Sequence, residues 1–161
     1  IGNREFLSIL LNKGYIMNLH ELKEEAKKDL PIRDQEHLEQ EGYKNQVLAP
    51  KWLDYRTRFK LLLTEAKGEY QRLYRQKWEY YGGKADAKIY VTKPFDLKIL
   101  KGDLHIYISS DEEIIEISNK ISYLETTFEF IEGVLKSIDR RSWDIKNAQD
   151  WKRFEAGLGM I

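Results

Sequence analysis

Residues 111–140, DEEIIEISNKISYLETTFEFIEGVLKSIDR, carry the most regular apolar pattern in the chain. Eight large apolar side chains follow one another there at steps that alternate between three and four residues: Ile114, Ile117, Ile121, Leu124, Phe128, Ile131, Leu135 and Ile138. This is the a and d spacing of a coiled-coil helix. Its mixture of Ile, Leu and Phe favours self-association into an assembly larger than a dimer, although a second helix of the same chain could cover the same seam.

The composition is that of a globular protein. Apolar residues make up 42% of the 161 residues, which is enough to fill a hydrophobic core. The absence of cysteine excludes disulfides, thiolate metal clusters and cysteine nucleophiles, and it suits a reducing compartment. The apolar runs are too short to cross a bilayer. We therefore expect no membrane span, no metal and no cofactor.

The net charge of zero hides two blocks of opposite sign. Residues 51–84 carry nine basic and four acidic side chains, whereas residues 111–139 carry two basic and eight acidic ones. A basic block of this kind can bind a polyanion, or the two blocks can be helices that attract each other within the chain. Both interpretations remain open at this level.

Helix signals are strong in the first half of the chain. Asn18 and Glu21 form a capping box that predicts a first helix. Pro50 introduces a periodic run that predicts a long helix over 51–81, and the glycine pair 82–83 predicts its end.

The segment after the glycine pair has a different composition. Three stretches are rich in β-branched and aromatic residues, namely IYV at 89–91, LKIL at 97–100 and LHIYIS at 104–109. With a Gly-Asp turn between the last two, they predict a small antiparallel β element. A last short helix is predicted from about Ile145. The expected fold class is therefore mainly α, with long helices and one small β element.

These signals divide the chain into four segments. Met17 directly precedes the first helix and the preceding residues look unlike the rest, so we interpret them as an upstream leader or read-through segment. The predicted segments are the leader at 1–16, a helical region at 17–84, the β element at 85–110 and a helical oligomerisation region at 111–161.

The stretch LYRQKWEYYGGKAD at 73–86 crowds rings and cations onto the last turns of the long helix. A helical wheel places six such side chains along one flank of the apolar stripe: Arg56, Lys60, Lys67, Tyr74, Arg75 and Trp78. Single-stranded nucleic acid requires cations that follow its phosphates and rings that stack on its bases. The 17–84 region is therefore predicted to bind it, although aromatic residues on a helix are more often core.

Four stretches, in this order and spacing, resemble the UvsY-type recombination mediator proteins of tailed bacteriophages: MNLHELKEEAKKDLPI, KWLDYRTRFKLLLTEA, RQKWEYYGG and DIKNAQDWKRFEAG. The resemblance runs from Met17 to the C-terminus. It implies a ring-like homo-oligomer of the hexamer or heptamer type that binds single-stranded DNA. It further implies a protein that is no enzyme, and that loads the phage strand-exchange recombinase onto DNA coated by the phage single-strand-binding protein, in the cytoplasm of the infected bacterial host.

The resemblance also adds one residue to the predicted DNA contacts. The family's DNA-contacting signature is a basic-x-basic pair before an acidic residue and two tyrosines, and here that pair falls on Arg75 and Lys77. Lys77 projects near the middle of the apolar stripe, an awkward position that contact with DNA would explain. The family places oligomer contacts toward the C-terminus, in agreement with the heptad seam. Residues 84–108 match the family poorly.

Enzyme and scaffold functions are the alternatives. The three histidines have no metal-ligand spacing, and GGK at 82–84 follows a helix and lacks the upstream part of a phosphate-binding loop. The acids at 111–116 suit the start of a helix better than a nuclease site. The stronger competitor is a coiled-coil scaffold or adaptor without nucleic-acid binding, in which the basic helix pairs only with the acidic one.

Overall fold

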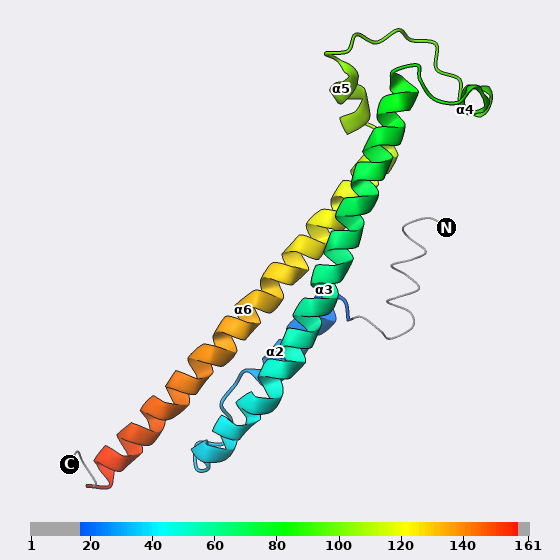
Figure 1. The fold of residues 1–161 in the computed structure, drawn as a ribbon. Helices are drawn as coiled ribbons and strands as arrows, with labels where there is room; N and C mark the ends of the chain where they lie inside the picture. The colour runs from blue at the N-terminus through cyan, green and yellow to red at the C-terminus, as the bar shows by residue number, and fades with distance from the viewer. Residues whose placement is uncertain (1–16, 158–161) are drawn as a thin grey trace. The chain divides into compact units, whose positions relative to one another are not determined.

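The computed structural model describes residues 17–157, and within that range it contains helices and no strand. The helices are α2 (Leu19–Asp29), α3 (Leu38–Tyr81), α4 (Ala87–Thr92), α5 (Leu104–Ser109) and α6 (Glu112–Glu155) (Figure 1). The expected mainly helical fold is confirmed, whereas the predicted leader at 1–16 lies outside the described residues. None of these helices is both long enough and apolar enough to span a membrane.

The first helix starts as its sequence predicts. The Asn18 side chain accepts a hydrogen bond from the Glu21 amide (2.9 Å), and the Glu21 carboxylate accepts one from the Asn18 amide (2.8 Å). This reciprocal pair satisfies two amides that the helix itself cannot pair. The capping box is therefore confirmed.

The two long helices extend further than predicted. α3 passes through Pro50, because the buried residues Leu48 and Trp52 on either side of it keep one apolar face continuous. α6 likewise includes the predicted separate helix at Ile145. Ile145 is buried and continues the seam seven residues after Ile138, while the buried Arg141 lies beside the seam position that the exposed Ser142 occupies.

The prediction of a β element at 85–110 is wrong. IYV lies in α4, where the Asp86 side chain caps the helix by accepting a hydrogen bond from the Lys88 amide (2.9 Å). LHIYIS forms α5. A strand would place residues 104, 106 and 108 on one face, but Leu104 and Ile108 are buried while Ile106 is 53% exposed. The burial follows the i, i+4 period of a helix.

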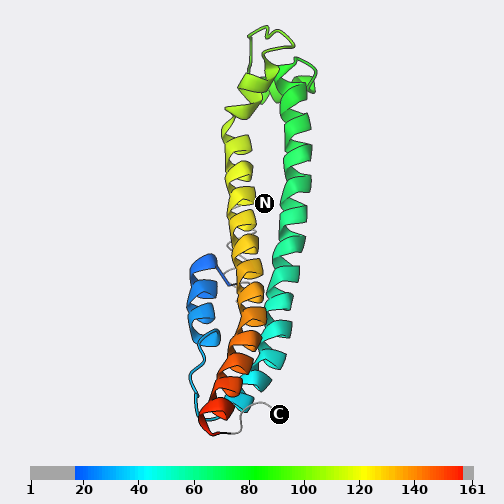
Figure 2. The ribbon, with the colours of Figure 1, turned by 90° about the vertical axis from the view of Figure 1, so that its left-hand side faces the viewer.

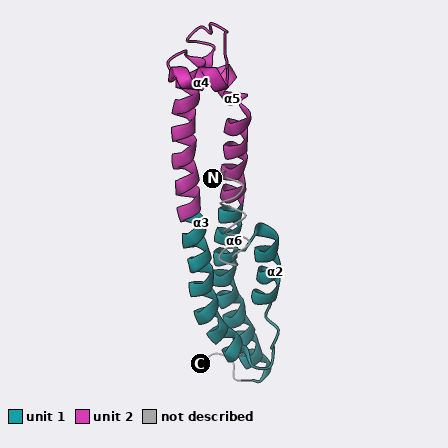
Figure 3. Ribbon diagram, turned by 90° about the vertical axis from the view of Figure 1, so that its right-hand side faces the viewer, with its two compact units in different colours: residues 1–60, 127–161 teal, residues 61–126 magenta. Residues whose placement is uncertain are grey.

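The chain divides into two compact units, residues 1–60 with 127–161 and residues 61–126 (Figure 3). Unit 1 contains α2, the first part of α3 and the last part of α6. Unit 2 contains the rest of α3, then α4, α5 and the first part of α6. Each unit is described on its own below.

Unit 1 is built around Trp52. Its side chain is fully buried, its indole N–H donates to the Asp29 carboxylate of α2 (2.9 Å), and its ring meets Phe130 of α6 edge-on with centroids 6.5 Å apart. α2 contributes two buried residues, Leu22 and Ala26, and lies beside the last part of α6 (Figure 2). One ring thus joins the three helical segments of this unit.

The heptad seam of α6 is covered by the same chain. Five of its eight residues are buried: Ile114, Ile117, Leu124, Ile131 and Ile138. The others, Ile121, Phe128 and Leu135, are half-buried. In unit 2, Ile114 belongs to a buried cluster against which Leu73 and Tyr74 of α3 pack. An intramolecular helix pair was the alternative use of this stripe, and it leaves little apolar area for another copy. Self-association through these positions stays a prediction without support from their burial.

Unit 1 contains a buried polar network near the start of α3. Arg141, 3% exposed, donates to the Leu30 carbonyl (3.1 Å), the Glu41 carbonyl (2.6 Å) and the Asn45 side chain (2.5 Å), and it pairs with the fully buried Glu41 carboxylate. Burial raises the pKa of Glu41, but hydrogen bonds and nearby positive charge outweigh it, so that the pKa is lowered. A buried charge pair of this kind tolerates the loss of neither partner.

We predict that Arg141→Met lowers the free energy of unfolding by about 3–5 kcal/mol, because it removes the buried cation of the network and leaves Glu41 paired with Lys44 alone. Arg140→Met, one residue earlier and exposed, should change it by less than about 0.5 kcal/mol. Urea titration followed by far-ultraviolet circular dichroism measures both. Equal midpoints for the two variants would show that the network does not stabilise the unit.

Candidate nucleic-acid interface

A glycine turn ends α3. The Gly83 amide donates to the Tyr80 carbonyl (3.2 Å), and the Lys84 amide donates to the Glu79 carbonyl (2.8 Å). Together with the positive φ of Gly83, 70°, these two bonds form a Schellman motif, which requires glycine at this point. The helix stop predicted at the glycine pair is confirmed.

The two tyrosines of the signature hold the following segment against the helix end. Tyr80 stacks on Tyr90 of α4 with centroids 5.6 Å apart, and the Tyr90 hydroxyl donates to the Tyr80 carbonyl (2.8 Å). Tyr81 meets Phe95 edge-on at 5.1 Å and lies 6.0 Å from Tyr107 of α5. These rings are engaged in packing, so they are not stacking platforms for a nucleic acid.

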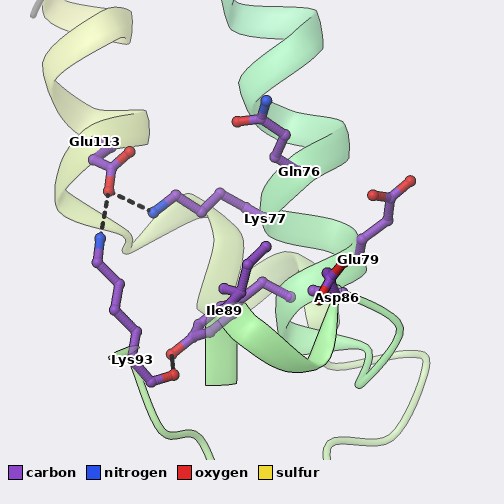
Figure 4. A pocket seen from close by; sticks show the side chains of 9 residues that line it. Gln76, Lys77, Glu79, Asp86, Ile89, Lys93 and Glu113 are labelled. Carbon is purple, nitrogen blue, oxygen red and sulfur yellow. Dashed lines mark hydrogen bonds and ion pairs between the residues drawn. The ribbon is translucent and has the colours of Figure 1, made fainter. Parts of the chain in front are cut away.

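Lys77 is held by two carboxylates. Its ammonium lies 2.9 Å from Asp111, just before α6, and 2.9 Å from Glu113 in its first turn, and its side chain is only 14% exposed. Lys93 approaches the same Glu113 at 3.4 Å (Figure 4). The position near the apolar stripe is therefore explained by internal ion pairs.

The protonation equilibria agree with this arrangement. Burial lowers the pKa of Lys77, but hydrogen bonds and attraction from Glu113 and Asp111 outweigh it, so the pKa is raised. The bond from Lys77 lowers the pKa of Glu113. Burial raises the pKa of Asp111, but bonds from Lys77 and Tyr81 outweigh it, so that the pKa is lowered. All three groups are thus charged near neutral pH.

Arg75 and Trp78 are the two accessible predicted contacts in the last turns of α3. Arg75 is 81% exposed and, among the described residues, forms an ion pair only with Glu79, one turn later, at 3.0 Å. Exposed pairs of this kind contribute about 0–1 kcal/mol, so a phosphate can replace the carboxylate. Trp78 is 40% exposed, and the Lys84 ammonium lies 4.6 Å from its ring centroid. An exposed cation–π contact is similarly weak, about 0.5–1 kcal/mol.

Tyr74 and Lys67 also belong to unit 2, but both have partners there. Tyr74 is half-buried against the Leu104 and Ile108 core. Lys67 is 55% exposed and pairs with Glu125 of α6 at 2.8 Å. Packing therefore accounts for Tyr74, and Lys67 presents a partly neutralised charge.

Arg56 and Lys60 lie in unit 1. Arg56 pairs with Glu132 of α6 at 2.9 Å and lies 5.4 Å from the Phe128 ring centroid. Lys60 is exposed. Including Lys67 and Lys77, three of the five predicted cationic contacts pair with carboxylates at or near α6, so the attraction between basic and acidic helices that the charge blocks allowed is present within the chain.

A pocket of about 440 Å³ lies beside Lys77. Lys77 and Lys93 line it, but so do the carboxylates of Glu79, Asp86 and Glu113 (Figure 4). This excess of negative charge disfavours a phosphate. No cluster of His, Asp or Glu in residues 17–157 is arranged to hold a metal ion.

Sequence reasoning missed Lys84. The GGK stretch is correctly interpreted as a helix stop, but that interpretation ends at the glycines. The residue after a Schellman glycine commonly contacts the helix about one and a half turns back, and here that partner is Trp78. The turn chemistry in the sequence could therefore have indicated this contact.

Comparison with known proteins gives consistent matches. A family model described as "Recombination, repair and ssDNA binding protein UvsY" matches residues 25–158. The recombination protein uvsY of Enterobacteria phage T4 is 28% identical over 141 residues, which cover 88% of this chain and 99% of that protein.

Crystal structures of the bacteriophage T4 recombination mediator protein UvsY are similar to this fold. The lattice type II form superimposes with a TM-score of 0.77 at 27% identity, covering 87% of this chain and 98% of that one. The lattice type I form gives 0.75 at 27% identity, with 83% and 98% covered.

We predict that Lys77→Met lowers the free energy of unfolding by about 2 kcal/mol, because Asp111 loses its cation and Glu113 keeps only the longer contact with Lys93. Arg75→Met, which removes an exposed charge, should change it by less than about 0.5 kcal/mol. Urea titration at neutral pH measures both.

The difference in the free energy of unfolding between wild type and Lys77→Met should depend on pH. Since the pKa values of Asp111 and Glu113 are lowered on folding, their contribution is fully present above the ordinary values of 3.8 and 4.5 and is lost as the pH falls through the lowered, folded-state values. The stability gap between wild type and Lys77→Met should therefore shrink in acid. A gap that persists undiminished at about pH 2 would contradict the ion-pair account.

Proposed function

Because the chain belongs to the UvsY family of recombination, repair and single-stranded DNA-binding proteins, we propose that it loads a strand-exchange recombinase onto single-stranded DNA coated by single-strand-binding protein. The observation that carries this proposal is the family match over residues 25–158, which includes all seven candidate DNA contacts. The proposed setting is the cytoplasm of a phage-infected bacterium. The proposal involves binding and assembly but no chemical step.

The exposure of Arg75 and Trp78 supports a contact site at the end of α3. In the proposal, Arg75 binds phosphate through its guanidinium fork and Trp78 stacks on a base. Lys60 and Lys67 add positive charge. Lys77 contacts DNA only by leaving two carboxylates, and Arg56 only by leaving Glu132, so we place both second in importance.

In the proposal, recombinase loading depends on many weak DNA-binding sites that act together. A few cations on one protomer bind a strand weakly, but repetition of the site around a ring of the hexamer or heptamer type raises the effective concentration of each next contact. A strand held in this way has fewer phosphates and bases available to the single-strand-binding protein. The single-strand-binding protein is then displaced, and the recombinase can nucleate on the strand that is exposed.

The proposed ring needs a surface other than the buried part of the heptad seam. The last turns of α6 offer one, since Trp143, Trp151 and Phe154 are 64%, 61% and 59% exposed. Trp151 and Phe154 pack on each other at 5.7 Å and leave the rest of their surface open. Large exposed aromatic residues are characteristic of association surfaces. We therefore propose that copies meet through this end of the 111–161 region.

A coiled-coil scaffold without nucleic-acid binding is the second candidate. The ion pairs between α3 and α6 favour it, because they occupy much of the basic block. It predicts no salt-sensitive association with oligonucleotides, so one titration distinguishes the two functions.

In that titration, fluorescence anisotropy follows a labelled oligothymidine at several salt concentrations. We expect binding that weakens with salt, and for Arg75→Ala a slope of log K against log salt that is smaller by about 0.7 per protomer. Arg72→Ala, an exposed arginine of the same helix that is not a candidate contact, is the control. Binding that is absent in wild type would favour the scaffold, and an unaltered slope in Arg75→Ala would remove that residue from the site.

A second experiment tests the assembly surface. Trp151→Ser with Phe154→Ser should yield smaller particles in light scattering while helicity is kept, because both side chains are exposed in the single chain. Leu97→Ser, at a residue that is 62% exposed in unit 2, provides the matched control. An assembly of unchanged mass in the double variant would rule out the end of α6 as the contact.

A further inference from the structure

The ammonium of Lys84 lies over an aromatic ring and not beside a carboxylate. Lys67, Lys77 and Lys93 each pair with a carboxylate, whereas the Lys84 Nζ lies 4.6 Å from the ring centroid of Trp78. Within residues 17–157 no carboxylate forms an ion pair with Lys84. Its charge is therefore available to an anion without the loss of an internal salt bridge.

The backbone fixes this lysine beside the ring. Lys84 follows the left-handed Gly83 of the Schellman motif, and its amide is bonded to the Glu79 carbonyl. A Cβ on Gly82 would lie 2.8 Å from the Trp78 carbonyl oxygen, so a larger residue there would displace the turn. In many Schellman motifs an apolar side chain occupies the position that Lys84 takes here. The two glycines thus place a cation where packing alone would favour an apolar residue.

An exposed indole with an adjacent ammonium matches the chemistry of one nucleotide. The indole offers a flat surface on which any base can stack, and the ammonium offers a charge-assisted bond to the attached phosphate. Arg75 lies three residues before Trp78 on the same helix, so a second exposed cation is next to the ring.

We infer that Trp78 and Lys84 form a subsite for one nucleotide of single-stranded DNA, with the base on the indole and its phosphate on the Lys84 ammonium. The inference rests on the proposed function and adds a cationic contact outside the basic-x-basic pair of Arg75 and Lys77. On binding, Lys84 exchanges a weak contact with a ring for a phosphate, whereas Lys77 would have to abandon two carboxylates.

The test compares two probes of equal charge, a short oligothymidine and an abasic oligomer with the same number of phosphates. The variants are Lys84→Gln, Lys84→Arg, Trp78→Leu and the double variant Lys84→Gln with Trp78→Leu. Lys101→Gln, an exposed lysine in the turn before α5, is the matched control. Circular dichroism on each variant checks that the helices are intact.

The subsite has a distinct signature in this comparison. Trp78→Leu should weaken oligothymidine binding by about 5- to 150-fold and abolish the preference for it over the abasic oligomer. Lys84→Gln should reduce the salt slope for oligothymidine by about 0.7 per protomer, Lys84→Arg should restore it, and Lys101→Gln should not change it. Since both residues act on one nucleotide, the loss in the double variant should be smaller than the sum of the single losses.

Failure of the inference can be told apart from failure of the proposed function. Wild-type protein that binds neither probe would remove the proposed function, and the subsite with it. If wild type binds but Lys84→Gln behaves like Lys101→Gln, the subsite is wrong while the function stands. Additive losses in the double variant, or reduced helicity in Lys84→Gln that Lys84→Arg does not repair, would likewise overturn the subsite.

Discussion

The pairing of basic α3 with acidic α6 is the constraint on which the rest of the structure depends. In unit 2, Lys67 pairs with Glu125 and Lys77 pairs with Glu113, so the two helices run antiparallel with their charges matched. Exposed pairs such as Lys67 with Glu125 contribute little stability, whereas Lys77 is largely buried and satisfies two carboxylates. The same pairing decides which cations are left to meet a polyanion. Arg75 and Lys84, near the end of α3, are two of these cations in unit 2.

The two cations of the basic-x-basic signature therefore differ in what they contact. Arg75 and Lys77 are two positions apart on a helix, so they project from different faces. Arg75 faces solvent and Lys77 faces the start of α6. The tyrosines that follow belong to packing as well, since Tyr80 and Tyr81 fix α4 and α5 to the helix end. Under the proposed function, this short motif combines a DNA-binding residue, Arg75, with residues that hold the helix end and its neighbours together.

Local signals in the sequence predicted much of the fold, and the misses have physical reasons. The capping box at Asn18 and the glycine stop after Tyr81 are decided by neighbouring residues, so one sequence suffices. The seam of α6 indicated an apolar face but not its partner, because α3 and another copy of α6 offer the same kind of surface. The β-branched residues around Ile106 favoured strands, yet only tertiary packing shows that Leu104 and Ile108 are buried together. Lys77 was similarly ambiguous, because its partners lie more than thirty residues away.

The central claim is that Lys84 and its neighbours face the DNA while Lys77 holds the helices together. Acetylation of lysine amines, quantified by mass spectrometry with and without oligothymidine, tests it on the unaltered protein. The account predicts that Lys84 reacts readily in the free protein and is protected by the oligonucleotide, that Lys77 reacts slowly in both states, and that Lys101 reacts equally in both. Protection that appears at Lys77, with Lys84 unaffected, would contradict it.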